Sequence, residues 1–261
     1  MQLRPSRSTF SIGYKRVCLV IVVIVIVLSI IFNNSINDIV CGYAVKKLPI
    51  YSVERNDKKI AISFDCAWGN EFTKKLLDIM DGYNVKCTFF IVSFWAEKYK
   101  EDLKEIVKRG HEVGTHSKTH PHMSKLSYDK VNYELDYSCS VIEEVIGKKV
   151  ELFRPPFGDY NNQLIDCAEQ KGLYTIQWDV DSLDWKNLSA RDIALRVISK
   201  INSGSIILCH NNGLHTAESL PLIFSDLIGK GYTFVPIGEL IYRDEYKISN
   251  DGRQILIDKK R

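Results

Sequence analysis

Residues 60–65 read IAISFD, a short apolar run that ends in an acid. Six more apolar runs follow, most of them rich in Val, Ile, Phe and Thr: 87–92, 112–115, 152–154, 174–178, 205–209 and 233–236. Helix-length amphipathic segments lie between them, for example 94–108, 128–146 and 190–201. Such alternation is typical of parallel strands covered by helices. Because the strands are almost continuously apolar, we predict an α/β barrel with seven strand–helix units.

The first part of the chain differs from the rest in charge and hydropathy. Residues 1–16 carry four basic side chains and no acid, and residues 17–32 contain no charge. A helix of this length spans about 24 Å, slightly less than a bilayer core of about 30 Å, although Lys15 and Arg16 can snorkel. We expect a single-pass membrane anchor with a cytoplasmic N-terminus and an extracytoplasmic domain. A cleaved signal peptide is the alternative, but residues 33–37 match a cleavage site poorly.

Composition limits the classes of function. The chain has 261 residues, with 35 Lys and Arg against 32 Asp and Glu; without the four bases of residues 1–16 the count is 31 against 32. A nucleic-acid-binding domain would carry a basic surface, so we expect no nucleic-acid partner. We also expect a monomer. The seven cysteines include no CxxC pair and do not indicate a disulfide scaffold.

The domain boundaries follow from these patterns. We expect a cytoplasmic segment 1–16, the anchor 17–32, a linker 33–57, one catalytic domain over 58–242, and a C-terminal extension 243–261. The extension contains YKISN-DG-RQILID, which predicts a hairpin with its turn at Asp251-Gly252.

Polar residues stand at the ends of five of the apolar runs: Asp65, His116, Arg154, Asp179 and His210. Parallel α/β folds collect their chemistry at the carboxyl ends of the strands. We therefore expect these side chains to meet at one rim. Each residue alone has an ordinary structural explanation, because acids cap helices and histidines are often buried.

The segment His116-Ser117-Lys118-Thr119-His120 places two imidazoles four residues apart. Pro121 disfavours a helix at His120, so we expect a single turn or a loop. Two imidazoles at this spacing can bind one metal ion, although such pairs also pack or face solvent.

Two further segments could complete a site. RPPFGDYN, residues 154–161, has a backbone stiffened by two prolines, and such a loop can aim an N–H group at an oxyanion. DVDSLDW, residues 179–185, offers acids that could orient a histidine and an aromatic ring that could flank a sugar. A turn and a helix-capping loop are the respective alternatives.

Taken in this order, the motifs resemble those of the polysaccharide deacetylases with a NodB homology domain, carbohydrate esterase family 4. The resemblance extends from about Lys59 to Glu239, and the FDxxWG form of the first motif is most similar to the PdaB-like branch linked to spore formation. It implies a distorted (β/α)7 barrel. It also implies a hydrolase that uses a divalent metal, usually zinc, to remove N-acetyl groups from amino sugars of a cell-wall polysaccharide such as peptidoglycan or a chitin-like glycan.

The resemblance assigns catalytic and metal-binding roles to individual residues. Asp65 matches the catalytic base, Arg154 the residue that positions it, and His210 the catalytic acid. His116 and His120 match the two metal-binding histidines.

It also assigns supporting and substrate-binding roles. Asp184 matches the acid that orients the catalytic histidine, and Trp185 the aromatic wall of the groove. The backbone N–H of Phe157 matches the oxyanion donor, Leu208 packs against the acetyl methyl group, and Tyr160 contacts substrate.

The first motif departs from the family at Cys66, where a second Asp usually completes the metal site. A Cys66 thiolate could replace that ligand. Alternatively, Cys66 is a buried small residue, and Asn70, Glu71 or water completes the shell. Three hypotheses follow: an active deacetylase, a glycan-binding barrel with weak or no hydrolysis, and a hydrolase of another C–N bond.

Overall fold

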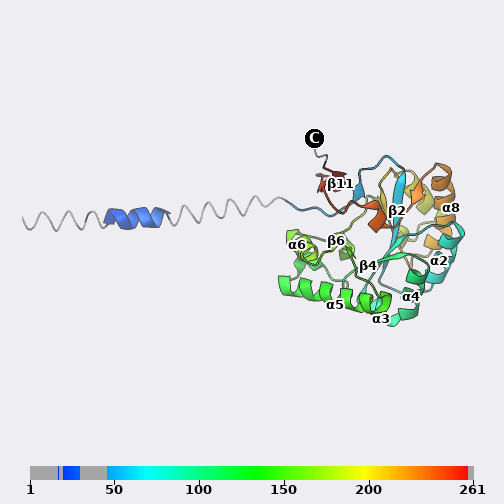
Figure 1. The fold of residues 1–261 in the computed structure, drawn as a ribbon, viewed down its shortest axis with the longest axis horizontal. Coiled ribbons are helices and arrows are strands. Elements are labelled where there is room, and N and C mark those ends of the chain that lie inside the picture. Colours follow the sequence, from blue (N-terminus) through cyan, green and yellow to red (C-terminus); the bar gives the residue numbers. More distant parts are fainter. Residues whose placement is uncertain (1–16, 18–19, 30–45, 258–261) are drawn as a thin grey trace, which may run out of the picture. The chain divides into compact units, whose positions relative to one another are not determined.

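The computed structural model describes residues 17, 20–29 and 46–257 (Figure 1). The chain divides into two compact units, Met1–Lys46 and Lys47–Arg261. In the first unit, residues 20–29 are helical. None of the helices in the described residues is long and apolar enough to cross a membrane. The predicted anchor includes residues 18, 19 and 30–32, which lie outside the described residues, as do segments 1–16, 33–45 and 258–261.

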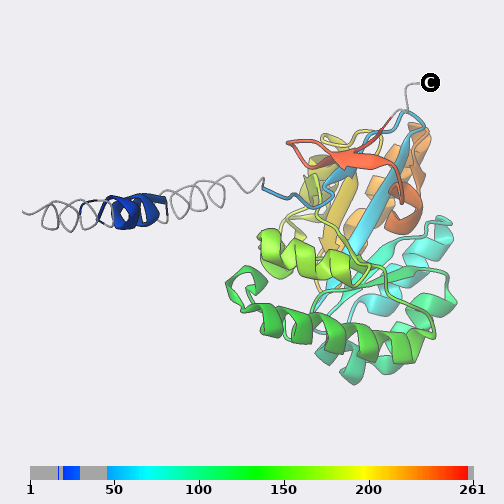
Figure 2. The same ribbon diagram turned by 60° about the vertical axis from the view of Figure 1, so that its left-hand side comes forward.

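The second unit is built around a parallel sheet of eight strands, in the order β6-β5-β4-β3-β2-β8-β7, with β9 paired to β2 (Figure 2). The strands are β2 (Lys59–Cys66), β3 (Thr88–Ile91), β4 (Glu112–Thr115), β5 (Leu152–Phe153), β6 (Tyr174–Thr175), β7 (Val180–Asp181), β8 (Ile206–His210) and β9 (Thr233–Phe234). Within the described residues the order ends at β6 and β7 without a pairing between them. The parallel α/β prediction is confirmed, but the barrel is open.

The central strand β2 shows why the sheet is buried on both faces. Ile60, Ile62 and Phe64 belong to the core between the strands and the helices, whereas Ala61 belongs to the separate cluster inside the barrel. Successive side chains of a strand point to opposite faces, so this alternation extends to the end of β2. Asp65 therefore shares the inner face with Ala61, and Cys66 shares the outer face with Phe64.

Among the described residues of the second unit, eight α-helices and three 3-10 helices accompany the strands. The α-helices are α2 (Thr73–Gly82), α3 (Ser93–Lys98), α4 (Lys100–Lys108), α5 (Tyr128–Ile146), α6 (Asn162–Gln170), α7 (Ala190–Ile198), α8 (Thr216–Gly229) and α9 (Ile237–Leu240). The 3-10 helices are η1 (Met123–Lys125), η2 (Pro156–Gly158) and η3 (Asp184–Lys186). The predicted segment 94–108 is two helices, because the chain breaks at Tyr99 (φ −119°, ψ 48°). Segment 128–146 forms α5, which ends at Gly147 in a left-handed conformation (φ 68°).

A second, three-stranded sheet joins the two ends of this unit. It has the order β1-β11-β10, where β1 is Ser52–Val53, β10 is Tyr246–Ile248 and β11 is Arg253–Leu256. β10 and β11 form the predicted antiparallel hairpin, and β1 pairs with β11 in parallel. Ile50 also bridges Ile176, and Ser52 bridges Ser205. The predicted linker 33–57 is therefore too long, since its last part belongs to the fold.

Candidate active site

A pocket of about 560 Å³ lies where the strands of the main sheet end. Asp65 is the last residue but one of β2, and His210 is the last residue of β8. The two residues are direct partners in the register of these strands. The residues that line the pocket are Asp65, Ala67, Trp68, His116, His120, Phe157, Trp178, Asp181, Trp185, Leu208, His210 and Asn212. The structure thus brings together most of the predicted residues from five separate segments of the chain.

Asp65 is paired with a buried arginine. Arg154 Nη1 donates to Asp65 Oδ1 at 2.8 Å, and Nη2 donates to the carbonyl oxygen of Gln177 at 3.1 Å. The guanidinium lies over the Phe90 ring, 4.1 Å from its centroid. Burial alone would raise the pKa of Asp65, but the charge of Arg154 and its hydrogen bond to the carboxylate oppose this, and the pKa lies below its ordinary value. Asp65 is therefore an ionised carboxylate at neutral pH.

His210 is held by a buried acid on the other side of the pocket. Asp184 Oδ1 accepts a hydrogen bond from His210 Nδ1 at 2.7 Å, and Oδ2 accepts from the His210 backbone N–H at 2.7 Å. Thr216 Oγ1 donates to the same Oδ2 at 2.6 Å. Burial lowers the pKa of His210, but the hydrogen bond and charge of Asp184 outweigh it, so the pKa is raised. The Nε2 atom remains available to a bound molecule.

His116 and His120 lie together beside Asp65. His116 Nδ1 hydrogen-bonds the carbonyl oxygen of Arg154 at 2.7 Å, and its Nε2 lies 3.5 Å from Asp65 Oδ2. The ring centroids of His116 and His120 are 4.9 Å apart. The rings of His120 and Phe157 pack edge to face, with 4.5 Å between their centroids. Burial lowers the pKa of both histidines, that of His120 to about 4. Both imidazoles are therefore neutral at physiological pH.

Exposed aromatic rings surround the mouth of the pocket. Phe157, Trp68 and Trp185 are all more than half exposed (60%, 59% and 56%) although they are large and apolar. Phe157 has a left-handed backbone (φ 61°), as has Leu183 (φ 53°), the residue before Asp184. Such backbone strain in residues other than glycine concentrates at functional sites. Leu208, only 3% exposed, forms an apolar part of the pocket wall.

Cys66 does not face this pocket. It lies on the outer face of β2, fully buried in the core between the strands and the helices, with Sγ 3.9 Å from the carbonyl oxygen of Phe64. Burial raises the pKa of the Cys66 thiol well above its ordinary value, so the thiol stays protonated. The structure contradicts the interpretation of Cys66 as a metal ligand and agrees with that of a buried small residue.

The alternative ligands do not replace it. Asn70 Nδ2 donates to Asp102 at 2.7 Å, Glu71 is exposed, and neither lines the pocket. Across residues 46–257, no three His, Cys, Asp or Glu side chains are arranged to hold a metal ion. The residues present therefore do not fit the three-ligand metal site that the resemblance implies.

Two other predicted residues lie elsewhere. Asp179 accepts hydrogen bonds from the Ile206 N–H and Ser205 Oγ, both at 2.8 Å, so it lies at the amino end of β8. The strand predicted to end at residue 178 ends at Thr175, and the chain has already turned. Tyr160 does not line the pocket; its hydroxyl accepts a hydrogen bond from the Tyr51 hydroxyl at 3.1 Å.

Ala67, Trp68, Trp178 and Asn212 line the pocket although no role was predicted for them, and Asp181 was named only as part of the segment 179–185. Trp68 and Asn212 follow shortly after Asp65 and His210. Residues that immediately follow a rim residue share its loop, and this signal could have identified both. Trp178 is the last residue of the predicted strand 174–178, whereas β6 ends at Thr175, so Trp178 lies in the loop that follows the strand.

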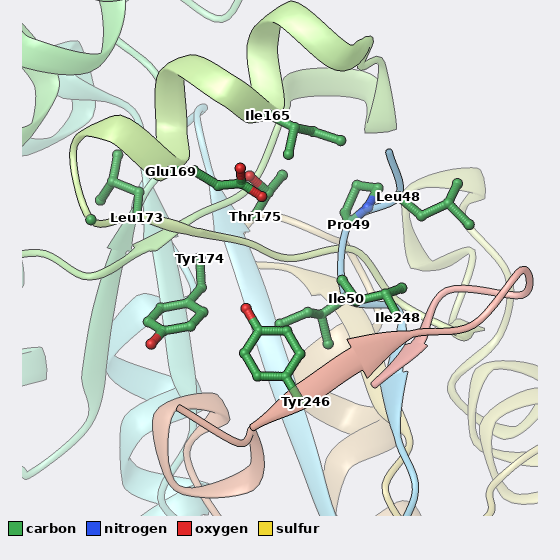
Figure 3. Close-up of a pocket in the computed structure, with 11 residues that line it drawn as sticks. Leu48, Pro49, Ile50, Ile165, Glu169, Leu173, Tyr174, Thr175, Tyr246 and Ile248 are labelled. Carbon is green, nitrogen blue, oxygen red and sulfur yellow. The ribbon is translucent and has the colours of Figure 1, made fainter. Parts of the chain in front are cut away.

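A second cavity, of about 240 Å³, shares no lining residue with the first, and Figure 3 shows the side chains around it. It is bounded by residues 48–50, by α6 and β6, and by Tyr246 and Ile248 of β10. None of the predicted site residues lines it.

Comparison with known proteins identifies the family. Residues 52–176 match the family described as "Polysaccharide deacetylase". The chain is 38% identical over 193 residues to the uncharacterized protein YlxY of Bacillus subtilis, covering 74% of this chain and 60% of that protein. It is 32% identical over 191 residues to a peptidoglycan-N-acetylglucosamine deacetylase of Bacillus cereus, covering 72% and 70%.

A solved structure shares both the fold and the sequence. The crystal structure of wild-type BA3943, described as a CE4 family pseudoenzyme from Bacillus anthracis, superposes with a TM-score of 0.72 at 35% identity, covering 75% of this chain and 69% of that one. A mutant of the same protein is described as having restored enzymatic activity. The matched motifs, the fold and these relatives together show that the chain belongs to the polysaccharide deacetylase family, the hydrolases of carbohydrate esterase family 4.

Proposed function

We propose that this domain removes N-acetyl groups from amino sugars of a cell-wall polysaccharide, either peptidoglycan or a chitin-like glycan. One observation carries the proposal. Two ion pairs, Asp65 with Arg154 and His210 with Asp184, hold a base and an acid in register on neighbouring strands beside one pocket. The groups differ as hydrolysis requires, because Asp65 has a lowered pKa and His210 a raised one.

The two groups suit the proton transfers of amide hydrolysis. Asp65 accepts a proton from the water that attacks the acetyl carbonyl carbon. The tetrahedral adduct then loses its C–N bond, and His210 donates a proton to the departing sugar amine. Acetate and the free amine are the products. The metal that the resemblance implies takes no part in this scheme, since the donor set does not fit it.

The pocket wall suits the proposed substrate. Leu208 is apolar, nearly buried and two residues from His210 on the same face of β8, which suits contact with an acetyl methyl group. The exposed rings of Phe157 and Trp185 suit the apolar faces of sugars.

Acetate release tests the proposal. The purified chain is incubated with N-acetylglucosamine oligomers and with peptidoglycan fragments, and acetate is measured. We expect release that is abolished in His210→Ala and Asp65→Asn and retained in His215→Ala, a partly exposed histidine outside the pocket. Equal release by wild type and His210→Ala would exclude the mechanism. Hydrolysis of other amides without acetate release would favour a different C–N bond as the substrate.

A second candidate is a glycan-binding barrel with weak or no hydrolysis. The burial of Cys66 favours it, because this position then supplies no ligand. The likeness to a protein described as a pseudoenzyme also favours it. On this view calorimetry detects glycan binding by the wild type without acetate release. Release by the wild type in the presence of a chelator would exclude this candidate.

We also propose that residues 17–32 anchor the chain in the cell membrane and place the domain outside the cytoplasm. The support is the uncharged segment preceded by Lys15 and Arg16. Carbonate extraction of membranes and protease accessibility in intact cells test this. We also propose a role in spore formation, which is supported by the resemblance of the first motif to the PdaB-like branch.

A further inference from the structure

The loop that carries the two pocket histidines has a strained backbone. It connects β4 to η1, and Ser117 (φ 74°) and His120 (φ 58°) both adopt left-handed conformations that residues with a side chain disfavour. Backbone of this kind persists only where surrounding contacts enforce it. The contacts that hold residues 117–120 therefore decide where the His120 imidazole lies.

A buried acid on α5 supplies the main contacts. Glu134 is only 7% exposed and lies on the buried stripe of α5 between Val131 and Ser138. Its Oε2 accepts hydrogen bonds from the backbone N–H groups of Lys118 (2.9 Å) and Thr119 (2.8 Å). Its Oε1 accepts from Thr119 Oγ1 at 2.7 Å. One carboxylate thus satisfies three donors of the loop between the histidines.

The same helix holds the loop at two more points. Ser138 Oγ accepts a hydrogen bond from Thr115 Oγ1 at 2.6 Å, just before His116. The Lys118 ammonium lies over the rings of Tyr133 and Tyr137, 4.2 and 3.9 Å from their centroids. These contacts fix the start of the loop and its exposed side, whereas Glu134 binds the backbone of the two residues before His120. Within the loop, Ser117 Oγ accepts a hydrogen bond from the His120 N–H at 2.9 Å.

We propose that Glu134 is a positioning residue that holds the His120 imidazole in the pocket. A carboxylate in a helix–sheet core is costly unless hydrogen bonds compensate it. Here the compensating donors all come from the strained loop. Its function is to keep His120 between the rings of Phe157 and Trp68, which lie 4.5 and 6.1 Å from it. The role in the reaction rests on the proposed function, but the position of His120 does not.

Nuclear magnetic resonance of histidine side chains in the full chain tests this without any activity. The His120 ring resonances are assigned by their loss in His120→Gln and carry the ring-current shifts of Phe157. We expect them to move toward values typical of solvent-exposed histidine in Glu134→Ala. They should stay in Glu134→Gln, because the amide oxygen can accept from both N–H groups and the amide nitrogen can donate to Thr119. They should also stay in Glu144→Ala, an exposed acid on the same helix.

A second variant protects the test against loss of folding. Thr119 is exposed, so Thr119→Val should fold, lose one of the three hydrogen bonds and shift the His120 resonances in the same direction by a smaller amount. Unchanged His120 resonances in folded Glu134→Ala would overturn the proposal. If Glu134→Ala does not fold, unchanged resonances in Thr119→Val would overturn it.

Kinetics separates this inference from the proposed function. If the wild type releases acetate, Glu134→Ala should lower kcat by about 10- to 100-fold with little change in KM, as expected for a misplaced group in the site. Glu134→Gln should recover most of that loss. A wild type without activity but with the expected resonance shifts would contradict the proposed function and leave the positioning role of Glu134 supported.

Discussion

The two sides of the pocket differ in how completely they are assembled. On one side, His210 has a buried acid that accepts hydrogen bonds from its ring, from its backbone and from Thr216. On the other side, His116 and His120 lie 4.9 Å apart between ring centroids, and the residue expected to join them, Cys66, faces the core. The acid side is built for proton transfer, whereas the imidazole pair lacks a third ligand. The chain therefore supplies every partner of the proposed proton donor, whereas its described residues do not supply the metal site that the resemblance implies.

The largest expected effect comes from removing the acid on the complete side. Asp184→Ala leaves His210 without orientation and without the charge that raises its pKa. We expect acetate release to fall by about 10²- to 10⁴-fold, the usual contribution of a general acid. Asp129→Ala, an exposed acid in the first turn of α5, should retain full release. A loss below tenfold in Asp184→Ala would mean that the two sides do not differ in this way.

The next effect concerns the support of Asp184. Thr216→Val removes the hydroxyl that donates to Asp184 Oδ2 and keeps the volume of the side chain. Hydrogen bonds to charged groups contribute about 1.5–3 kcal/mol, so we expect the free energy of unfolding in urea to fall by about that amount. Thr216→Ser should retain most of it. A Thr216→Val variant as stable as the wild type would show that the third hydrogen bond is dispensable.

The pH dependence sharpens the comparison, because the pKa of His210 on one side is raised and the pKa of His120 on the other side is lowered. The pKa of His210 is raised above 6.5, so its contribution to stability is complete below 6.5 and is lost as pH rises through the folded value. The pKa of His120 is lowered to about 4, so its contribution is complete above 6.5 and is lost as pH falls toward 4. Nuclear magnetic resonance titration should give midpoints in this order. Acetate release should decline on the alkaline side as His210 loses its proton, and midpoints in the reverse order would contradict the assignment.

The smallest effect is expected at Cys66. Because the thiol lies in the core and not in the pocket, Cys66→Ala should change acetate release by less than about twofold and cost about 1 kcal/mol of stability, an ordinary value for a core truncation. Isothermal titration with Zn²⁺ should give the same result for both proteins. A variant that loses zinc binding would show that Cys66 turns toward the histidines, and the contrast between the two sides would disappear.

Much of the rim could be predicted from the sequence because of one simple regularity. Residues that follow apolar runs in a parallel sheet lie at the same edge, which places Asp65, His116 and His210 correctly. Arg154 follows the same rule, although its side chain turns inward beneath Asp65. The rule failed at Asp179, because the strand before it is three residues shorter than its apolar run. Apolar character marks burial and does not mark where a strand ends.

Two features of the site required the structure. Cys66 points to the core because β2 extends as far as this residue. Successive side chains of a strand point to opposite faces, so Asp65 faces the pocket and Cys66 faces away from it. The sequence shows the apolar run but does not show at which residue the strand ends. Glu134 could have been noticed as an acid on the buried stripe of α5, but which donors it meets depends on how the helix packs against the loop after β4. Pairings between distant segments of this kind are not visible in local patterns.

The pairing of β1 with β11 has a practical consequence for protein engineering. Residues 52–53 and 253–254 are bonded in parallel, so the two ends of the folded unit fasten one another. Removal of either β1 or β11 would leave the other without its partner strand. A boundary placed after Ser52 would also remove the bridges of Ile50 to Ile176 and of Ser52 to Ser205. Because its two ends lie side by side, the unit is suited to insertion into a surface loop of a host protein, with one linker at each end.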